Sequence, residues 1–300
     1  MTEERKQEIL EIIRNTNRRP AQTGKPLYPE EIMAYPNLCE EIESISRTVD
    51  GFSYRMDILR AKNRGENCPL FINIHGGGFI GPHRENDTYF SAYMADQIHG
   101  ITVDLDYTLS DAAPYPVALH QCMDALDYVA EHANKWGASA KDISVGGYSA
   151  GGALTAAMGI CCAERGGFVP KLQILCYPPL EYRIPDQYKI DAYDRQIGME
   201  RCKAFADLYF DDKKENFEDI HNSPLYAPRE ILAKQPKTLI LSAGLCNFRY
   251  EDEDYAICLA DAGAEVILKR FPEASHGFIP HFMDGWKEAA DLMVREILEK

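Results

Sequence analysis

The sequence predicts an α/β protein whose mostly parallel sheet carries helices on both faces. Short apolar segments alternate with longer segments of helical periodicity, which is typical of parallel strands buried on both sides. We expect eight strands, at about residues 43–49, 53–60, 69–74, 101–107, 143–147, 172–177, 238–242 and 265–271. The 300 residues are enough for one large domain of this class, and we expect a single domain over 1–300.

The elements follow in order along the chain. Residues 1–40 begin as a polar helix and become loop-like around Pro29 and Pro36. The first two strands meet at Asp50-Gly51, which favours a hairpin and therefore an antiparallel edge of the sheet. Apolar residues recur at helical spacing at about 88–98, 117–136, 150–164, 252–262 and 284–299. The long strandless span after residue 177 is interpreted as a helical cap over the carboxyl ends of the strands.

Composition and charge restrict the class of partner. The net charge is −15 without any block of Lys and Arg, which argues against nucleic acid or an anionic membrane as a partner. The charged N-terminus lacks the apolar core of a signal peptide, and no apolar run approaches the about 18 residues of a membrane span. Nine cysteines without a C-x-x-C pair favour reduced thiols and a cytoplasmic location.

The segment VGGYSAGG, residues 145–152, carries the first chemical signal. Ser149 follows an apolar strand, stands between Gly147 and Gly151, and precedes a helix rich in small residues. This G-x-S-x-G pattern is typical of a nucleophile elbow, in which a sharp strand-to-helix turn exposes the serine hydroxyl. An ordinary glycine-rich turn is the alternative, so the interpretation depends on the other motifs.

Two further segments contain what a nucleophilic serine needs. His75 and Phe79 enclose three glycines directly after an apolar strand, and such a loop lets backbone N–H groups converge on an oxyanion. A phosphate-binding loop would need a Gly-Lys-Ser/Thr sequence, which is absent. His276 follows the last expected strand, 127 residues after Ser149, in the chain order of a serine, an acid and then a histidine.

These motifs resemble the hormone-sensitive-lipase family of α/β hydrolases. The matching segments are HGGGF (75–79), Asp106-Tyr107-x-Leu109, Pro114-Tyr115-Pro116, GYSAGG (147–152) and SHGF (275–278). The resemblance runs from about residue 50 to the C-terminus and implies the α/β-hydrolase fold, with an eight-stranded, mostly parallel sheet. It also implies that about 1–40 and 181–235 form a two-part cap lining the acyl and alcohol pockets.

The resemblance also implies roles for individual residues. It makes Ser149 the nucleophile and His276 the general base and then the general acid. It places the oxyanion hole at the backbone N–H groups of Gly77, Gly78 and Ala150. His75 is similar to a loop-organising residue of the family.

The family's catalytic acid is where this sequence departs from the pattern. Its position after the penultimate strand holds Cys246, and residue 148, ordinarily Asp, is Tyr. Glu251 and Asp252 in the neighbouring turn, or Glu181 from a different strand end, are alternative acids, and Asn247 is a neutral alternative. In the Ser-His-Asp template, replacing the carboxylate by a neutral amide lowers turnover by about 10⁴-fold. The sequence alone therefore leaves the acid unassigned.

The function expected from these residues is hydrolysis of carboxylic esters of small acyl groups through an acyl-serine intermediate. Tyrosines of the cap, among them Tyr188 and Tyr193, indicate a partly polar pocket for a small-molecule ester. One alternative is a catalytically impaired hydrolase that binds a ligand, and another is an amide or peptide hydrolase. No cofactor and no metal are expected, and the resemblance is compatible with a homodimer.

Overall fold

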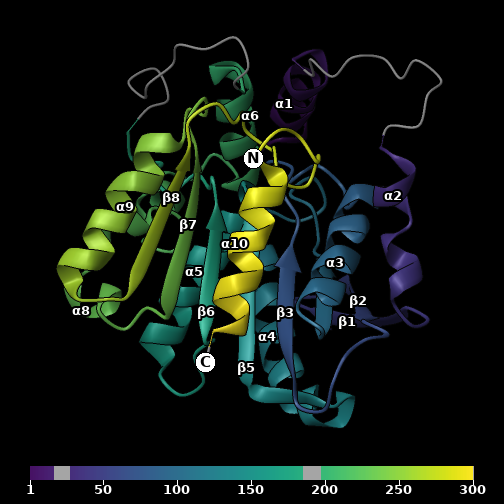
Figure 1. Cartoon of the computed structure of the whole chain (residues 1–300). Helices are drawn as coiled ribbons and strands as arrows, with labels where there is room; N and C mark the ends of the chain where they lie inside the picture. Colours follow the sequence, from purple (N-terminus) through teal and green to yellow (C-terminus); the bar gives the residue numbers. More distant parts are fainter. Residues whose placement is uncertain (17–27, 185–196, 300) are drawn as a thin grey trace.

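Eight strands form one sheet in the computed structural model, which describes residues 1–16, 28–184 and 197–299 (Figure 1). The strands are β1 (Glu43–Val49), β2 (Phe52–Arg60), β3 (Cys68–Ile74), β4 (Ile101–Asp106), β5 (Ala138–Tyr148), β6 (Leu172–Cys176), β7 (Lys237–Ala243) and β8 (Val266–Phe271). Their order across the sheet is β1-β2-β4-β3-β5-β6-β7-β8. The predicted eight-stranded sheet is therefore confirmed.

The sheet is parallel from β4 to β8 and antiparallel at one edge. β3 pairs in parallel with β4 and β5, and β6, β7 and β8 continue in the same direction. β2 is antiparallel to both β1 and β4. The turn between β1 and β2 uses Asp50 and Gly51 at φ values of 53° and 83°, the positive pair that a tight hairpin needs. This turn confirms the predicted antiparallel edge.

Ten α-helices and three 3₁₀ turns accompany the sheet in the described part of the chain. The α-helices are α1 (Glu3–Asn15), α2 (Glu30–Met33), α3 (Glu85–Gln97), α4 (Val117–His132), α5 (Ala150–Arg165), α6 (Met199–Tyr209), α7 (Lys214–Glu218), α8 (Arg229–Leu232), α9 (Arg249–Ala262) and α10 (Trp286–Leu298). The 3₁₀ turns are η1 (Tyr35–Leu38), η2 (Ala133–Trp136) and η4 (Pro224–Tyr226).

Helices cover both faces of the sheet, as the apolar strands require. Ile174 of β6 packs into a core cluster with α3 and α10, which lie on the near face in Figure 1. The next residue, Leu175, packs with α5 and α9 on the opposite face. Because successive side chains of a strand point to opposite faces, this alternation shows that β6 is buried on both sides.

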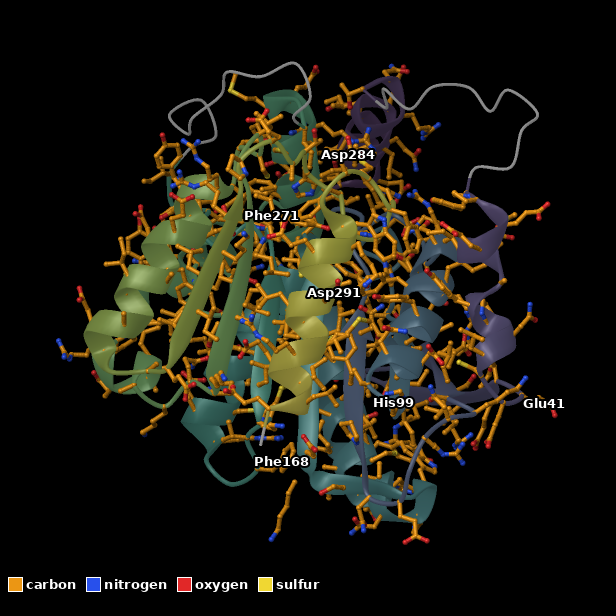
Figure 2. All side chains as sticks on the ribbon, in the orientation of Figure 1. Glu41, His99, Phe168, Phe271, Asp284 and Asp291 are labelled. Atoms are coloured by element: carbon orange, nitrogen blue, oxygen red, sulfur yellow. The ribbon has the colours of Figure 1, made fainter. Side chains whose placement is uncertain are left out.

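The carboxyl ends of the parallel strands meet at one edge of the sheet, beneath α6. Figure 2 shows Phe271, which ends β8, at this upper edge and Phe168, which precedes β6, at the lower edge. Ile9 and Ile13 of α1 pack against Ala204 and Leu208 of α6, so the N-terminal helix and the inserted span are joined above the strand ends.

Other parts of the expected cap segments lie elsewhere or are not described. η4 and α8 return to pack against α5 and α9 beside the sheet. Residues 17–27 and 185–196 of the expected cap, and with them Tyr188 and Tyr193, lie outside the described residues. None of the described helices is long and apolar enough to cross a bilayer.

Two element boundaries differ from the sequence prediction, one for a local reason and one for a long-range reason. α3 begins at Glu85 and not at 88, because the Asp87 carboxylate accepts the Arg84 N–H over 2.9 Å and caps an earlier first turn. β5 begins at Ala138 and not at 143, because Ala138 pairs with Cys68 at the start of β3. The second extension depends on a partner strand about 70 residues away in the sequence, which local periodicity does not contain.

Candidate active site

Ser149 lies in the turn between β5 and α5, at the carboxyl edge of the sheet. Its backbone has a φ of 54° and a ψ of −120°, which is a strained conformation for a residue with a side chain. The Ser149 N–H donates to the carbonyl oxygen of Cys176 over 2.9 Å and ties the turn to β6. A strained serine between a strand and a helix is the context that the G-x-S-x-G motif requires.

The imidazole of His276 lies next to this serine. His276 is in the loop after β8, and its Nε2 is 2.8 Å from the Ser149 Oγ. This distance is within the about 2.6–3.2 Å that proton transfer between a nucleophile and its base needs. The rings of Tyr177 and Phe248 meet the imidazole edge-on, at centroid distances of 5.0 and 5.5 Å. Burial lowers the pKa of His276 to about 3, so the ring is neutral at physiological pH.

Cys246 occupies the other side of the imidazole. Its Sγ lies 3.1 Å from the Nδ1 of His276, where a triad would place a carboxylate. The Sγ also accepts the backbone N–H of Phe248 over 3.4 Å. Burial raises the pKa of the Cys246 thiol well above its usual range, so the group beside Nδ1 is a neutral thiol.

Glu251 and Glu181 are directed toward backbone groups. The Oε2 of Glu251 accepts the N–H groups of Leu180 and Glu181 over 2.7 and 2.9 Å. The Oε1 of Glu181 accepts the N–H of Ile184 over 2.8 Å. These contacts hold the chain together after β6, and neither glutamate hydrogen-bonds His276.

Asp252 and Asn247 are not in contact with the imidazole either. Asp252 is fully buried, and burial beside Glu251 raises the pKa of this carboxyl group well above its usual range. Its two oxygens have no hydrogen-bond partner within the described residues. The Nδ2 of Asn247 donates to the carbonyl oxygen of Ile197 over 3.1 Å. Among the described residues, therefore, no carboxylate hydrogen-bonds His276.

The glycine loop after β3 lies beside the serine turn. In the described part of the chain, the N–H groups of Gly77 and Gly78 donate to no backbone carbonyl. Gly78 has a φ of 62°, and a Cβ there would lie 2.4 Å from the ring of Phe205, so a larger residue would have to displace that ring. Ala150 is the first residue of α5, and the first N–H groups of a helix have no intrahelical partner. The oxyanion-hole role of these three N–H groups stays a prediction.

Polar side chains lie next to the glycine loop on its buried side. Of these, the pair of His83 and Asp104 was not predicted from the sequence. The His75 ring is fully buried and stacks on Tyr107 at a centroid distance of 4.3 Å. The Tyr107 hydroxyl donates to the His75 carbonyl oxygen over 3.1 Å. Next to it, the Nε2 of His83 is 2.7 Å from the Oδ2 of Asp104, a buried pair that raises the pKa of His83 to about 9. Asp104 stands between the apolar residues Val103 and Leu105 in β4, and a charge at that buried position was the available signal.

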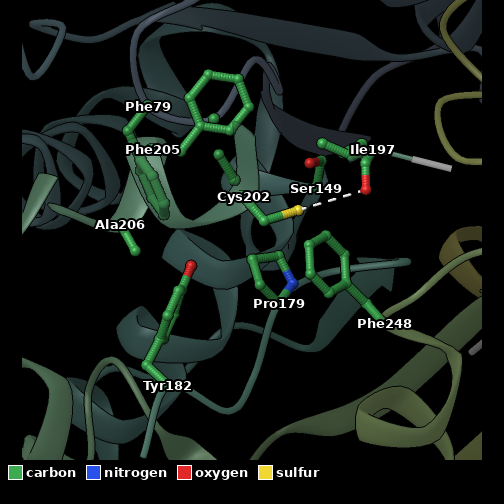
Figure 3. A pocket seen from close by; sticks show the side chains of 11 residues that line it. Phe79, Ser149, Pro179, Tyr182, Ile197, Cys202, Phe205, Ala206 and Phe248 are labelled. Carbon is green, nitrogen blue, oxygen red and sulfur yellow. Dashed lines mark hydrogen bonds between the residues drawn. The ribbon is translucent and has the colours of Figure 1, made fainter. Parts of the chain in front are cut away.

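A small, largely apolar pocket opens at Ser149 (Figure 3). Its polar lining groups are Ser149, Tyr182 and Cys202, and the remaining lining is aliphatic or aromatic. Phe205 and Ala206 of α6 close the pocket on one side and Phe248 on another. The lining residues from α6 were missed by sequence analysis, although the aromatic content of the inserted span pointed to this region. All nine cysteines are free thiols, and no group of three metal-ligating side chains lies within the described ranges.

This arrangement of sheet, serine turn, glycine loop and histidine defines the class of α/β hydrolases. Comparison with known families gives the same result, because a family model described as the alpha/beta hydrolase fold matches residues 71–280. The chain belongs to this family.

Individual relatives and solved structures show which members of the family this chain is similar to. The chain is 30% identical over 217 residues to the esterase LipI of Mycobacterium tuberculosis, and this alignment covers 71% of the chain and 66% of LipI. It is 29% identical over 120 residues to hormone-sensitive lipase of Bos taurus, covering 40% of the chain and 16% of that protein. A thermostable esterase from Pseudomonas putida superposes with a TM-score of 0.75 at 25% identity, covering 98% of this chain and 95% of that chain.

These similarities confirm the resemblance to the hormone-sensitive-lipase family and the α/β-hydrolase fold. The chain spans slightly less than two thirds of the length of LipI and a smaller part of hormone-sensitive lipase. The solved esterase, by contrast, is matched over nearly its whole length.

Proposed function

We propose that the protein hydrolyses carboxylic esters through an acyl-serine intermediate at Ser149. The observation that carries this proposal is the 2.8 Å contact between the Nε2 of a neutral His276 and the Oγ of Ser149, a residue that lines a pocket. The names of the relatives, among them an esterase of M. tuberculosis and an esterase of P. putida, support the same reaction class.

The reaction follows from the geometry in two halves. The Ser149 Oγ attacks the ester carbonyl carbon and its proton passes to the Nε2 of His276, while the N–H groups of Gly77, Gly78 and Ala150 stabilise the oxyanion. His276 then gives this proton to the leaving alcohol as the C–O bond breaks. In the second half a water molecule, deprotonated by His276, attacks the acyl-enzyme and releases the carboxylic acid and Ser149.

We further propose that the substrate carries a small acyl group and that α1 and α6 belong to the family's cap. The narrow pocket supports a small acyl group, since α6 places Phe205 directly over Gly78. Within the described residues, Tyr182 is the one tyrosine that lines the pocket. The described part of the pocket wall is therefore more apolar than the tyrosine-rich sequence of this span indicated. A homodimer and a cytoplasmic location stay predictions, and light scattering after gel filtration would test the first.

Labelling with a fluorophosphonate tests the proposed function without requiring the natural substrate. We expect one covalent adduct on Ser149, located by peptide mass spectrometry, together with turnover of p-nitrophenyl acetate and butyrate. An adduct is expected because the reagent needs an activated serine and an oxyanion hole. Absence of both labelling and turnover in folded protein would overturn the proposal and leave a ligand-binding protein. Faster cleavage of an acyl anilide than of the matched ester would favour the amidase alternative.

Phe205→Ala is expected to shift the preference of the enzyme toward longer acyl chains. Removing this ring opens the pocket beside Ser149, and each newly buried CH₂ contributes about 0.8 kcal/mol. We expect the ratio of kcat/KM for p-nitrophenyl hexanoate over acetate to rise about tenfold. Phe168→Ala, at the opposite edge of the sheet, is the matched control and should leave this ratio unchanged. An unchanged ratio in Phe205→Ala would exclude this ring as the limit on acyl length.

A further inference from the structure

Both ring nitrogens of His276 are already engaged, and neither partner is a carboxylate. Nε2 contacts the Ser149 Oγ over 2.8 Å and Nδ1 contacts the Cys246 Sγ over 3.1 Å. The sulfur also accepts the Phe248 N–H, so a hydrogen-bond donor is already directed at it. With the proton on Nδ1, two donors are directed at this one atom, which is the arrangement that usually holds the carboxylate of a triad in place.

Among the described residues, no carboxylate hydrogen-bonds either member of this pair. Tyr177 and Phe248 cover the imidazole with their rings, and His281 is a further titratable group, close enough to lower the pKa of His276. Burial opposes ionisation of the Cys246 thiol most strongly, and a negative charge on Asp252 or Glu251 of α9, which lie behind it, would oppose it further. The Glu251 carboxylate accepts two backbone N–H groups, and it would have to break both of these hydrogen bonds to contact the Nδ1 of His276.

We propose that Cys246, as a neutral thiol, is the positioning residue that orients His276 for catalysis in place of a carboxylate. In the productive arrangement Nδ1–H donates to the Cys246 sulfur, which leaves the Nε2 lone pair free to accept the Ser149 proton. The proton that arrives during the attack stays on Nε2, and the thiol keeps its own. This inference rests on the proposed function and deepens it.

A thiol and a carboxylate differ in two ways that can be measured. A carboxylate accepts only, whereas a neutral thiol can also donate to Nδ1 and so stabilise the unproductive tautomer. A carboxylate also stabilises the imidazolium through its charge, and the thiol does not. We therefore expect slower turnover than a complete triad would give, and a His276 that stays neutral down to an unusually low pH.

Substitutions at Cys246 test the first difference through kcat for p-nitrophenyl acetate. Cys246→Asp should raise kcat by about tenfold or more, because it supplies both the acceptor and the charge. Cys246→Ser keeps a small acceptor and should retain kcat within about threefold, whereas Cys246→Ala should lower it by about tenfold to a hundredfold. Asp252→Asn and the half-exposed Cys258→Ser are controls that should change kcat less than about threefold.

The pH profile tests the second difference and is a readout that a merely structural cysteine would not move. Wild-type kcat/KM should be flat from about pH 8 to about pH 5.5, because the His276 base is already deprotonated there. In Cys246→Asp the new carboxylate favours the imidazolium, so the acid limb should move up toward about pH 6–7. Circular dichroism at each pH confirms that the protein remains folded near its pI of about 5.0.

Failure of this inference is distinguishable from failure of the proposed function. A wild-type rate that halves between about pH 6 and 7 would show that a carboxylate already supports His276, and would overturn the role of Cys246. A large loss of kcat in Asp252→Asn, with none in Cys246→Ala, would overturn it as well. Either result still requires an active serine that reacts with the fluorophosphonate, whereas an inert serine would remove the proposed function itself.

Discussion

Ser149→Ala is expected to abolish hydrolysis of p-nitrophenyl acetate, with kcat reduced by about 10⁴ to 10⁶-fold. The alanine leaves His276 and the oxyanion N–H groups in place but removes the only atom that forms the covalent intermediate. Fluorophosphonate labelling should disappear in the same variant. The fold should persist, because the lost hydroxyl makes one hydrogen bond, worth about 1 kcal/mol, to His276.

Ser139→Ala is the matched control for this variant. Ser139 lies on the same strand, β5, but at the opposite edge of the sheet, where its hydroxyl accepts a local backbone N–H from Lys141. Its kcat and its labelling should match the wild type. A Ser149→Ala variant that retained more than about a tenth of wild-type kcat would place the nucleophile elsewhere.

Gly151→Ala is expected to give the largest loss of stability of any single-methyl addition at the site. A Cβ at Gly151 would lie 2.1 Å from the carbonyl oxygen of Ile74 and 2.6 Å from that of His75. Both obstacles are backbone, so β3 or the serine turn must move. Alanine favours a helix interior over glycine by about 1 kcal/mol, yet the clash should outweigh this and lower the free energy of unfolding by about 3 kcal/mol or more. Chemical denaturation measures the change, and esterase activity should fall with it.

Gly65→Ala separates the clash from a general effect of replacing glycine. Nothing lies within 4 Å of a Cβ at Gly65, and its φ does not require glycine. The free energy of unfolding should therefore change by less than about 0.5 kcal/mol, or increase slightly as the unfolded chain loses entropy. Equal stability of Gly151→Ala and Gly65→Ala would mean that β3 and α5 are not in close contact at the elbow.

The class of fold and the position of the proposed nucleophile can be predicted from the sequence because their causes are local. Apolar segments that alternate with helical periodicity leave a sheet covered on both faces as the way to bury them. The strained turn at Ser149 needs small residues next to it, and Gly147 and Gly151 stand there in the sequence. His276 follows the last strand, and parallel strands bring their carboxyl ends to one edge. Pattern and order therefore predict which groups can meet.

What meets the far side of the imidazole is decided only in three dimensions. With Cys246 at the position of the family's acid, the sequence left Glu251, Asp252, Glu181 and Asn247 as alternatives, since all follow strand ends at the same edge of the sheet. Hydrogen bonding by side chains depends on direction at a scale of about 0.5 Å, which residue spacing does not encode. The turn after β7 places Cys246 on Nδ1, whereas Glu251 points to the backbone after β6 and Asp252 is enclosed behind the thiol. The sequence thus indicated the proposed nucleophile and its base, and tertiary packing decided that a sulfur atom, not a carboxylate, contacts the far side of the imidazole.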